Sequence, residues 1–254
     1  MPQENTPDLW FTDFPQREAD SHKYDYGHAL IYGAPELTGA TRLAASACAR
    51  IGAGLTTVLA KEGDVYRGTL PAHIMVRDNT AWSDKRVSAR LYGPGGMAKG
   101  VKISLNRSCV LDADALLCMP DKLNEQTVLT PHGGEFAKAF PDIEGSREDK
   151  ALNAARRTGA VIVLKGVETV VAHPDGRCVV NKHDSSNLST AGTGDVLAGL
   201  VTGLLAQGMP AFEAACAAVW IHGDAALKFG PGLVATDLID LIPKVLQEGL
   251  GFSR

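Results

Sequence analysis

Short apolar runs alternate with polar loops and alanine-rich stretches along most of the chain. Six of the runs have the length and composition of buried β-strands, and they lie at residues 29–32, 55–60, 88–92, 109–111, 128–130 and 161–164. A helix is expected at residues 40–51, between the first two runs. This rhythm of strand, polar loop and helix is typical of a mostly parallel sheet with helices on both faces. We therefore predict an α/β fold.

The pattern changes after residue 168. Two apolar runs, at 169–173 and 177–180, flank the tripeptide Pro-Asp-Gly. Asp-Gly is a common turn between antiparallel strands, so this segment is predicted to form a β-hairpin. The last third of the chain is predicted to be helical, with helices at 193–207, 210–229 and 236–247.

No repeat, low-complexity tract or linker divides the chain. Residues 1–21 mix proline, aspartate and aromatic side chains, and we expect them to form an N-terminal arm outside the core. Residues 22–254 are predicted to form a single domain, which is within the usual size range for an α/β fold.

Composition and charge narrow the class of protein. The chain has 254 residues, 45% of them hydrophobic and 21% charged, which is ordinary for a globular protein. A net charge of −4 without a basic stripe argues against nucleic acid as the partner. The five cysteines are scattered and include no Cys-x-x-Cys pair, so we expect reduced thiols and a cytoplasmic location. The polar start does not resemble a signal peptide, and no apolar run is long enough to cross a membrane.

Polar and glycine-rich clusters follow five of the predicted strands or open a helix, which places them where open α/β sheets bind ligands. The strongest is Gly192-Thr193-Gly194-Asp195, directly before a helix. Free amides of Gly192, Thr193 and Gly194 would form an anion hole, and Asp195 would be the catalytic base of a phosphoryl transfer. The alternative is that Thr193 is a helix N-cap and Asp195 only stabilises the helix dipole; the motif alone does not decide.

Three other clusters have both a functional and a structural interpretation. Lys165 ends a strand and could bind a nucleotide phosphate, or it could be an ordinary exposed lysine. His132, between Pro131 and Gly133, could orient a ligand or simply be solvated. Asp112 and Asp114 could hold Mg²⁺ through water, or Asp114 could cap the following helix. None of the histidines has the spacing of a dedicated metal site.

Gly93-Pro94-Gly95-Gly96 follows a strand and fits the glycine pattern of a dinucleotide-binding Rossmann turn. Only about a dozen residues separate it from the next predicted strand, which leaves little room for the crossover helix that the motif requires. We interpret the segment as a ligand-facing loop instead. A phosphate-binding P-loop is absent from the sequence.

Taken together, these segments resemble the ADP-dependent NAD(P)H-hydrate dehydratase family of the ribokinase-like superfamily. The resemblance extends from about His22 to Leu246. It is carried by seven collinear motifs: YGAPELTGA at 32–40, RIGAGL at 50–55, GPG at 93–95, LDADAL at 111–116, LTPHGGE at 129–135, VLKGVET at 163–169 and GTGD at 192–195.

The resemblance implies a ribokinase-like α/β/α sandwich and a repair reaction. The S epimer of hydrated NADH or NADPH would be dehydrated to the normal cofactor while ADP is split to AMP and phosphate, with Mg²⁺ bridging phosphates and no metal site of the protein's own. The residues expected to contact the hydrated dinucleotide are Ala40, Gly95, His132 and Asp195. Those expected to hold the adenine nucleotide are Lys165, Gly166, Val167, Glu168, Thr169 and Gly194.

The same resemblance implies partners. Many relatives carry an epimerase domain in front of the dehydratase, so an epimerase is expected here as a separate protein, and we expect a homo-oligomer. Two alternatives remain: a ribokinase-like vitamin-pathway kinase that uses ATP on a small hydroxymethyl compound, and a non-catalytic nucleotide-sensing module. The intact Asp195 argues against the second.

Overall fold

A computed structural model describes residues 2–249 and shows one sheet of ten strands, ordered β1-β10-β9-β8-β7-β6-β5-β2-β3-β4. Only β9 runs antiparallel to its neighbours among these strands. The strands are β1 (Gln3–Glu4), β2 (His28–Tyr32), β3 (Leu55–Leu59), β4 (Met75–Arg77), β5 (Val87–Tyr92), β6 (Ser108–Leu111), β7 (Thr127–Leu129), β8 (Val161–Leu164), β9 (Thr169–Ala172) and β10 (Cys178–Asn181).

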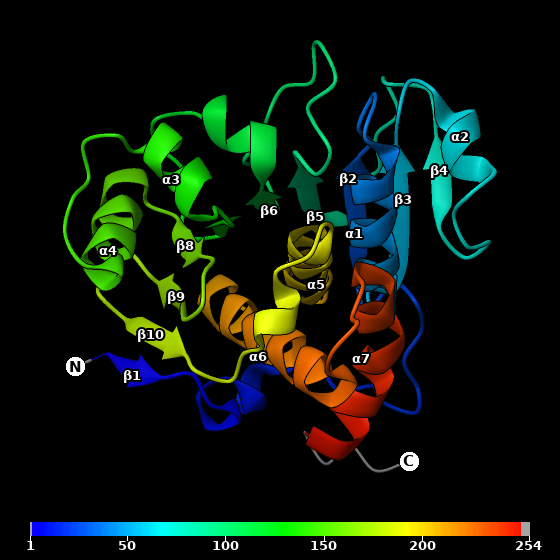
Figure 1. The fold of residues 1–254 in the computed structure, drawn as a ribbon. Coiled ribbons are helices and arrows are strands. Elements are labelled where there is room, and N and C mark those ends of the chain that lie inside the picture. Colours follow the sequence, from blue (N-terminus) through cyan, green and yellow to red (C-terminus); the bar gives the residue numbers. More distant parts are fainter. Residues whose placement is uncertain (1, 250–254) are drawn as a thin grey trace.

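Helices cover both faces of the sheet (Figure 1). One layer contains α1, α5 and α6, with α7 packed outside them; α3 and α4 belong to the other. The α-helices are α1 (Thr38–Arg50), α2 (Gly63–Arg67), α3 (Gly133–Ala139), α4 (Arg147–Thr158), α5 (Thr193–Ala206), α6 (Ala211–Phe229) and α7 (Ala235–Gly249). Four short 3-10 helices are η1 (Pro7–Leu9), η2 (Phe11–Asp13), η3 (Ala113–Leu117) and η4 (Ser186–Leu188). The predicted α/β sandwich is confirmed.

The apolar runs form strands because both faces of the sheet are covered. In β8, Val161 and Val163 belong to the core under α5 and α6, whereas Ile162 and Leu164 belong to the core under α4. Strands buried on both faces read as continuous apolar runs rather than as an alternating pattern. This explains why the sequence predicts the central strands to within one or two residues.

Close packing of α5 against α1 fixes the position of the α5 N-terminus. A Cβ atom at Gly199 would lie 2.2 Å from the carbonyl oxygen of Ala44, and one at Gly203 would lie 2.3 Å from the Cγ2 atom of Ile51. The two glycines therefore let the helix backbones approach more closely than larger residues would. As a result, α5 begins at the edge where the parallel strands end.

The expectation that residues 1–21 lie outside the core is wrong for their first part. β1 adds a strand next to β10, and Asn5 and Trp10 are each 1% exposed. Phe14 also belongs to the core, and the ring of Trp10 lies 6.0 Å from that of Trp220 on α6. The aromatic side chains bury apolar surface against α6, which outweighs the polar composition of the segment.

The loops that follow β2, β5, β6, β7 and β8 all leave the sheet at one edge, since these strands are parallel. Six of the seven motifs lie on these loops and on the N-terminus of α5, whereas RIGAGL at 50–55 connects α1 to β3. No helix among residues 2–249 combines the length and the hydropathy that crossing a membrane requires.

Candidate active site

Gly192 and Thr193 determine the backbone conformation at the start of α5. Gly192 occupies the N-cap position with φ +91°, a left-handed conformation that glycine adopts without strain. The hydroxyl of Thr193 donates to the carbonyl oxygens of Leu188 (2.8 Å) and Thr190 (3.0 Å). Thr193 is therefore not the N-cap, which was one of the two structural alternatives. The first-turn amides lack intrahelical partners and form the positive end of the helix dipole.

The Asp195 carboxylate is partly buried in this first turn. It makes no hydrogen bond or ion pair within the described part of the chain, so it does not cap the helix. Burial raises the pKa of Asp195 to about 6, and the nearby Asp112 and Glu135 carboxylates add to the rise while Lys165 opposes it. A carboxylate that titrates near neutral pH is suited to general base catalysis.

Lys165 is the central cation of the site. Its Nζ atom lies 3.0 Å from Oδ1 of Asp112 and 3.8 Å from Oε2 of Glu135. The Asp112 carboxylate is only 5% exposed, and the hydroxyl of Thr130 also donates to it at 2.8 Å. Burial alone would lower the pKa of Lys165, but Asp112, Glu135 and Asp195 raise it above its ordinary value. The ammonium therefore stays charged beside three carboxylates.

The ammonium also contacts the first turn of α5. A Cβ atom at Gly194 would lie 3.2 Å from Nζ of Lys165, a distance tighter than most real contacts. Gly194 thus leaves room for the lysine at the point where the helix amides are free. Two separate motifs of the sequence thus meet at one place, the first with Lys165 and the second with Gly194 and Asp195.

A cavity of about 720 Å³ opens beside this cluster. Its size is within the range of small-molecule and cofactor sites. Every residue predicted to hold the adenine nucleotide lines it, namely Lys165, Gly166, Val167, Glu168, Thr169 and Gly194, and so does His132. The remaining lining residues are Lys182, Asp184, Ser185, Ser186, Leu188, Ser189, Thr193, Leu197, Val219 and His222.

Ala40 and Gly95 form a second group outside the cavity lining. A Cβ atom at Gly95, whose φ is +78°, would lie 3.0 Å from the Cβ atom of Ala40. Thr41 joins the two loops, because its hydroxyl accepts from the amide of Ala34 (3.0 Å) and donates to the carbonyl of Pro94 (3.2 Å). This group lies where α1 meets the loop after β5, and α5 packs against the same helix α1.

His132 is not on a free turn, since it is the N-cap of α3. Its Nδ1 atom accepts from the amides of Gly134 (3.0 Å) and Glu135 (3.4 Å). The Glu135 carboxylate accepts from the amide of His132 at 2.8 Å, which completes a capping box. The imidazole is nevertheless 59% exposed and lines the cavity, so contact with a ligand stays a prediction.

Two substitutions separate the capping role of His132 from ligand binding. His132→Ala is expected to weaken binding of hydrated dinucleotide more than binding of ADP and to cost about 1 kcal/mol of stability through the lost cap. His132→Asn keeps a good N-cap and is expected to restore stability but not dinucleotide affinity. Calorimetric titration with each ligand and thermal melting measure the two effects. Equal losses of affinity for both ligands would contradict the assignment.

Asp112 and Asp114, which the sequence suggested as a pair for Mg²⁺, do not lie together in one site. Asp112 is paired with Lys165, whereas Asp114 is exposed in the first turn of η3. Ala113 between them has φ +45°, the only positive value at a non-glycine position among the described residues, so the backbone is strained beside the site. No group of three or more His, Cys, Asp or Glu side chains suited to a metal ion occurs within residues 2–249.

Sequence reasoning missed His222. Its Nε2 atom lies 2.9 Å from the carbonyl oxygen of Thr193, so this nitrogen carries the proton. Burial lowers the pKa of His222 to about 4, so the ring is neutral and braces the first turn of α5 from α6. The role of His222 depends on a contact with Thr193, which is 29 residues away in the sequence, so the spacing of the histidines does not reveal it.

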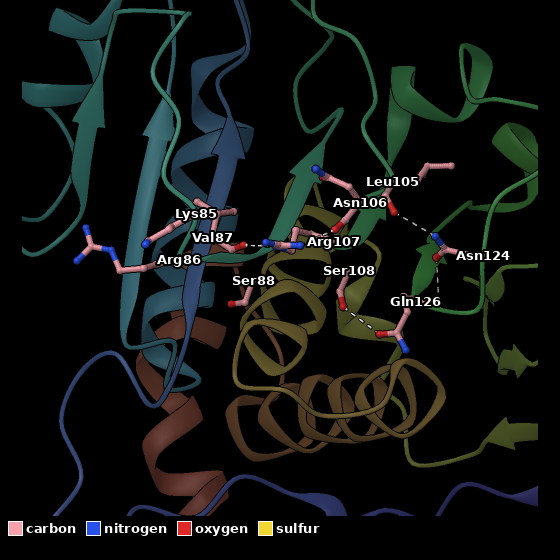
Figure 2. A pocket seen from close by; sticks show the side chains of 10 residues that line it. All are labelled: Lys85, Arg86, Val87, Ser88, Leu105, Asn106, Arg107, Ser108, Asn124 and Gln126. Carbon is pink, nitrogen blue, oxygen red and sulfur yellow. Dashed lines mark hydrogen bonds between the residues drawn. The ribbon is translucent and has the colours of Figure 1, made fainter.

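A second hollow, of about 450 Å³, lies at the opposite edge of the sheet, at the amino ends of β5 and β6 (Figure 2). Its polar groups are largely bonded to one another. Arg107 donates to the carbonyl of Val87 (3.0 Å), and Ser108 donates to Gln126 (3.1 Å). It contains neither a carboxylate nor a glycine-rich turn. The cavity at the carboxyl edge is therefore the candidate active site.

The sheet order, the helix layers on both faces and a helix N-terminus beside a cavity are features of an α/β fold. A solved ribokinase-like protein from Enterococcus faecalis superposes with a TM-score of 0.82 over 97% of this chain and 95% of its own, at 23% identity. A family model described as NAD(P)H-hydrate dehydratase matches residues 28–245. The chain belongs to the NAD(P)H-hydrate dehydratase family, as its motifs predicted.

Individual relatives agree with this family. An ADP-dependent (S)-NAD(P)H-hydrate dehydratase from Neisseria meningitidis is 34% identical over 87% of this chain and 84% of its own length. A bifunctional NAD(P)H-hydrate repair enzyme from Salinibacter ruber is 39% identical over 95% of this chain. The chain spans about half of that relative, 52% of its length. An ADP/ATP-dependent NAD(P)H-hydrate dehydratase from Bacillus subtilis, co-crystallised with ATP and Mg²⁺, superposes with a TM-score of 0.84 at 29% identity, over 97% of this chain and 98% of its own.

Proposed function

We propose that this protein repairs NADH and NADPH that have gained water at C6 of the nicotinamide ring. It dehydrates the S epimer to the normal cofactor and splits ADP to AMP and phosphate. Family membership supports the reaction class. The observation that carries the proposal is the meeting of Asp195, Lys165 and the free α5 amides beside a nucleotide-sized cavity.

The chemistry balances in two steps. Asp195 takes the proton of the C6 hydroxyl as the hydroxyl oxygen attacks the β-phosphorus of ADP. The bond between the β-phosphorus and the oxygen that bridges it to the α-phosphorus breaks, which releases AMP. The C6–oxygen bond then breaks as the ring nitrogen donates its lone pair, and phosphate leaves. Loss of the C5 proton completes the dihydronicotinamide ring. The hydroxyl oxygen of the substrate thus ends in the phosphate.

The cavity lining contains both apolar and polar groups, which suits the base and the phosphates of a nucleotide. Leu188, Leu197 and Val219 give it an apolar part that would accept the base. Lys165 and Gly194 lie at the α5 N-terminus, where the amides of Gly192 to Gly194 would stabilise charge on the transferred phosphoryl group. The hydrated dinucleotide would be held by Ala40 and Gly95, which lie outside the cavity lining, and by His132, which lines the cavity.

Charge balance at the site fits a magnesium ion carried by the nucleotide. Asp112, Glu135 and Asp195 face one ammonium, so the cluster is acidic before any phosphate enters. Mg²⁺ uses few carboxylates and keeps phosphate and water ligands, and it neutralises phosphate charge when bound. The carboxylates of Asp112 and Glu135 are the protein groups that would face such an ion. A cytoplasmic location, a homo-oligomer and a separate epimerase stay predictions.

The direct test is incubation with hydrated NADH and either ADP or ATP. Recovery of dihydronicotinamide absorbance is the expected result, with AMP and phosphate released in equal amounts when ADP is supplied, and ADP is expected to support faster turnover than ATP. Phosphorylation of a small hydroxymethyl compound by ATP, without repair of hydrated NADH, would instead favour the vitamin-pathway kinase. Binding of ADP without turnover would favour the sensing module.

Turnover is expected to depend on pH through Asp195. The base acts only when it is deprotonated, so with a pKa of about 6 kcat/KM should rise about tenfold per pH unit below that value and level off above it. A pH series on the wild-type chain, with circular dichroism at each pH as the folding control, measures this. A profile that stays flat down to about pH 4 would exclude a carboxylate base with this pKa.

A further inference from the structure

The N-terminal segment, residues 3–14, contacts β10, the strand that leads into the wall of the nucleotide cavity, although it precedes the family match at 28–245. Its contact is made through Asn5, which is 1% exposed. The side-chain amide of Asn5 donates to Oδ1 of Asn181 (2.9 Å) and to the carbonyl of Cys216 on α6 (2.8 Å). Asn5 also accepts from the indole of Trp10 at 3.2 Å. All of its side-chain atoms able to hydrogen-bond are therefore used.

The contact continues from Asn181 to His183. The side-chain amide of Asn181 donates to the carbonyl of His183 at 2.7 Å. A Cβ atom at Gly223 on α6 would lie 1.9 Å from the same carbonyl, so the chain at His183 is pressed against that helix. The side-chain amide of Asn181 and the close approach of Gly223 on α6 thus fix the backbone where it leaves β10.

The imidazole of His183 is held as firmly as its backbone. Its Nε2 atom lies 2.9 Å from Oδ1 of Asp224, and Lys228 pairs with the other oxygen of that carboxylate at 3.4 Å. The ring stacks on Trp220 with centroids 4.6 Å apart and an interplanar angle of 9°. Trp220 in turn lies against Trp10 of the N-terminal segment. The N-terminal segment is therefore connected to His183 by hydrogen bonds through Asn181 and by aromatic contacts through Trp220.

His183 stands at the start of a wall of the cavity. Six of the residues between 182 and 189 line the cavity: Lys182, Asp184, Ser185, Ser186, Leu188 and Ser189. Apart from η4, which packs against α6, this stretch has no regular secondary structure, so contacts at its ends contribute to its position. One end is His183, and the other is Leu188, whose carbonyl accepts from Thr193 at 2.8 Å.

We propose that residues 3–14 act as a brace that positions segment 182–189 for nucleotide binding, with Asn5 and His183 as its positioning residues. The inference rests on the proposed function only in naming ADP as the ligand of this cavity. Removing the Asn5 side chain leaves the buried indole N–H of Trp10 and the Oδ1 atom of Asn181 without partners, which loosens the Asn181 side chain that holds the backbone at His183. Binding of the hydrated dinucleotide is expected to change less, because Ala40 and Gly95 lie outside the cavity lining.

The test compares Asn5→Ala with Gln3→Ala in the full chain. Gln3 is an exposed neighbour on the same short strand, so its replacement keeps the backbone pairing and leaves the brace intact. Hydrogen exchange at 184–189 is expected to become about tenfold faster in Asn5→Ala only, while exchange at 133–139 stays unchanged. The dissociation constant for ADP is expected to rise about five- to tenfold, with dinucleotide binding changed less than twofold.

A second variant covers a failure of Asn5→Ala to fold. His183→Phe keeps the stack on Trp220 but loses the bond to Asp224, and the same local increase in exchange is expected. Unchanged exchange at 184–189 in a folded variant, or an equal increase throughout the chain, would overturn the brace. If the wild-type chain does not bind ADP, the proposed nucleotide is wrong, and the exchange data still decide whether the brace exists.

Discussion

Asp195→Asn is expected to reduce turnover at least ~100-fold while the fold and ADP binding persist, because a positioned general base contributes about 10²–10⁴ in rate. Asparagine keeps the shape of the side chain but does not accept the proton of the C6 hydroxyl. The Asp195 carboxylate makes no hydrogen bond that the substitution would break, so little stability should be lost. Removing a partly buried carboxylate beside Asp112 and Glu135 should instead relieve repulsion.

Asp149→Asn is the matched control for this substitution. Asp149 lies in the first turn of α4 and completes a capping box with Ser146, so it is a first-turn acid with a structural role. Its replacement should cost about 0.3–1 kcal/mol through the helix dipole and cap, with unchanged turnover. Steady-state kinetics and thermal melting on both variants distinguish the roles. A lower melting temperature with near-normal turnover in Asp195→Asn would show that Asp195 is structural.

The parts of the fold that the sequence predicts are those whose signal is local. The run at 161–164 is apolar throughout because β8 is buried on both faces, and Asp-Gly at 175–176 forms the turn of the hairpin between β9 and β10. The glycines of the α5 motif predict a helix start because their backbone requirement is local as well. Gly192 indeed adopts a left-handed conformation at the N-cap.

The missed parts depend on contacts between distant segments. Nothing near Trp10 in the sequence reveals that it packs against Trp220, so the N-terminal segment reads as a polar arm. The pairing of Lys165 with Asp112 follows from strand order, because β7 lies between β6 and β8 and the lysine reaches across it. A single sequence gives the strand ends but not their order, and so it leaves the carboxylate partners of Lys165 open.

Lys165→Met is expected to lower the free energy of unfolding by about 3 kcal/mol, because it leaves a buried carboxylate without its counter-ion. Asp112 is 5% exposed, and only the Thr130 hydroxyl would remain as a donor to it. The same change removes the cation at the α5 N-terminus, so ADP affinity should fall as well. Because Lys165 lowers the pKa of Asp195, its loss should also move the acid limb of the pH profile to higher pH.

The control is Lys182→Met, which removes another lysine that lines the cavity. Lys182 is 59% exposed and only 3.9 Å from Glu4, a pair that contributes little stability. The double variant Lys165→Met with Asp112→Asn separates the effects further, because removing both charges should recover stability but not ADP affinity. Thermal melting, calorimetric titration with ADP and a pH series measure the three quantities. Equal small losses in Lys165→Met and Lys182→Met would contradict a buried ion pair at Lys165, whereas recovery of ADP affinity in the double variant would show that the lysine does not contact the nucleotide.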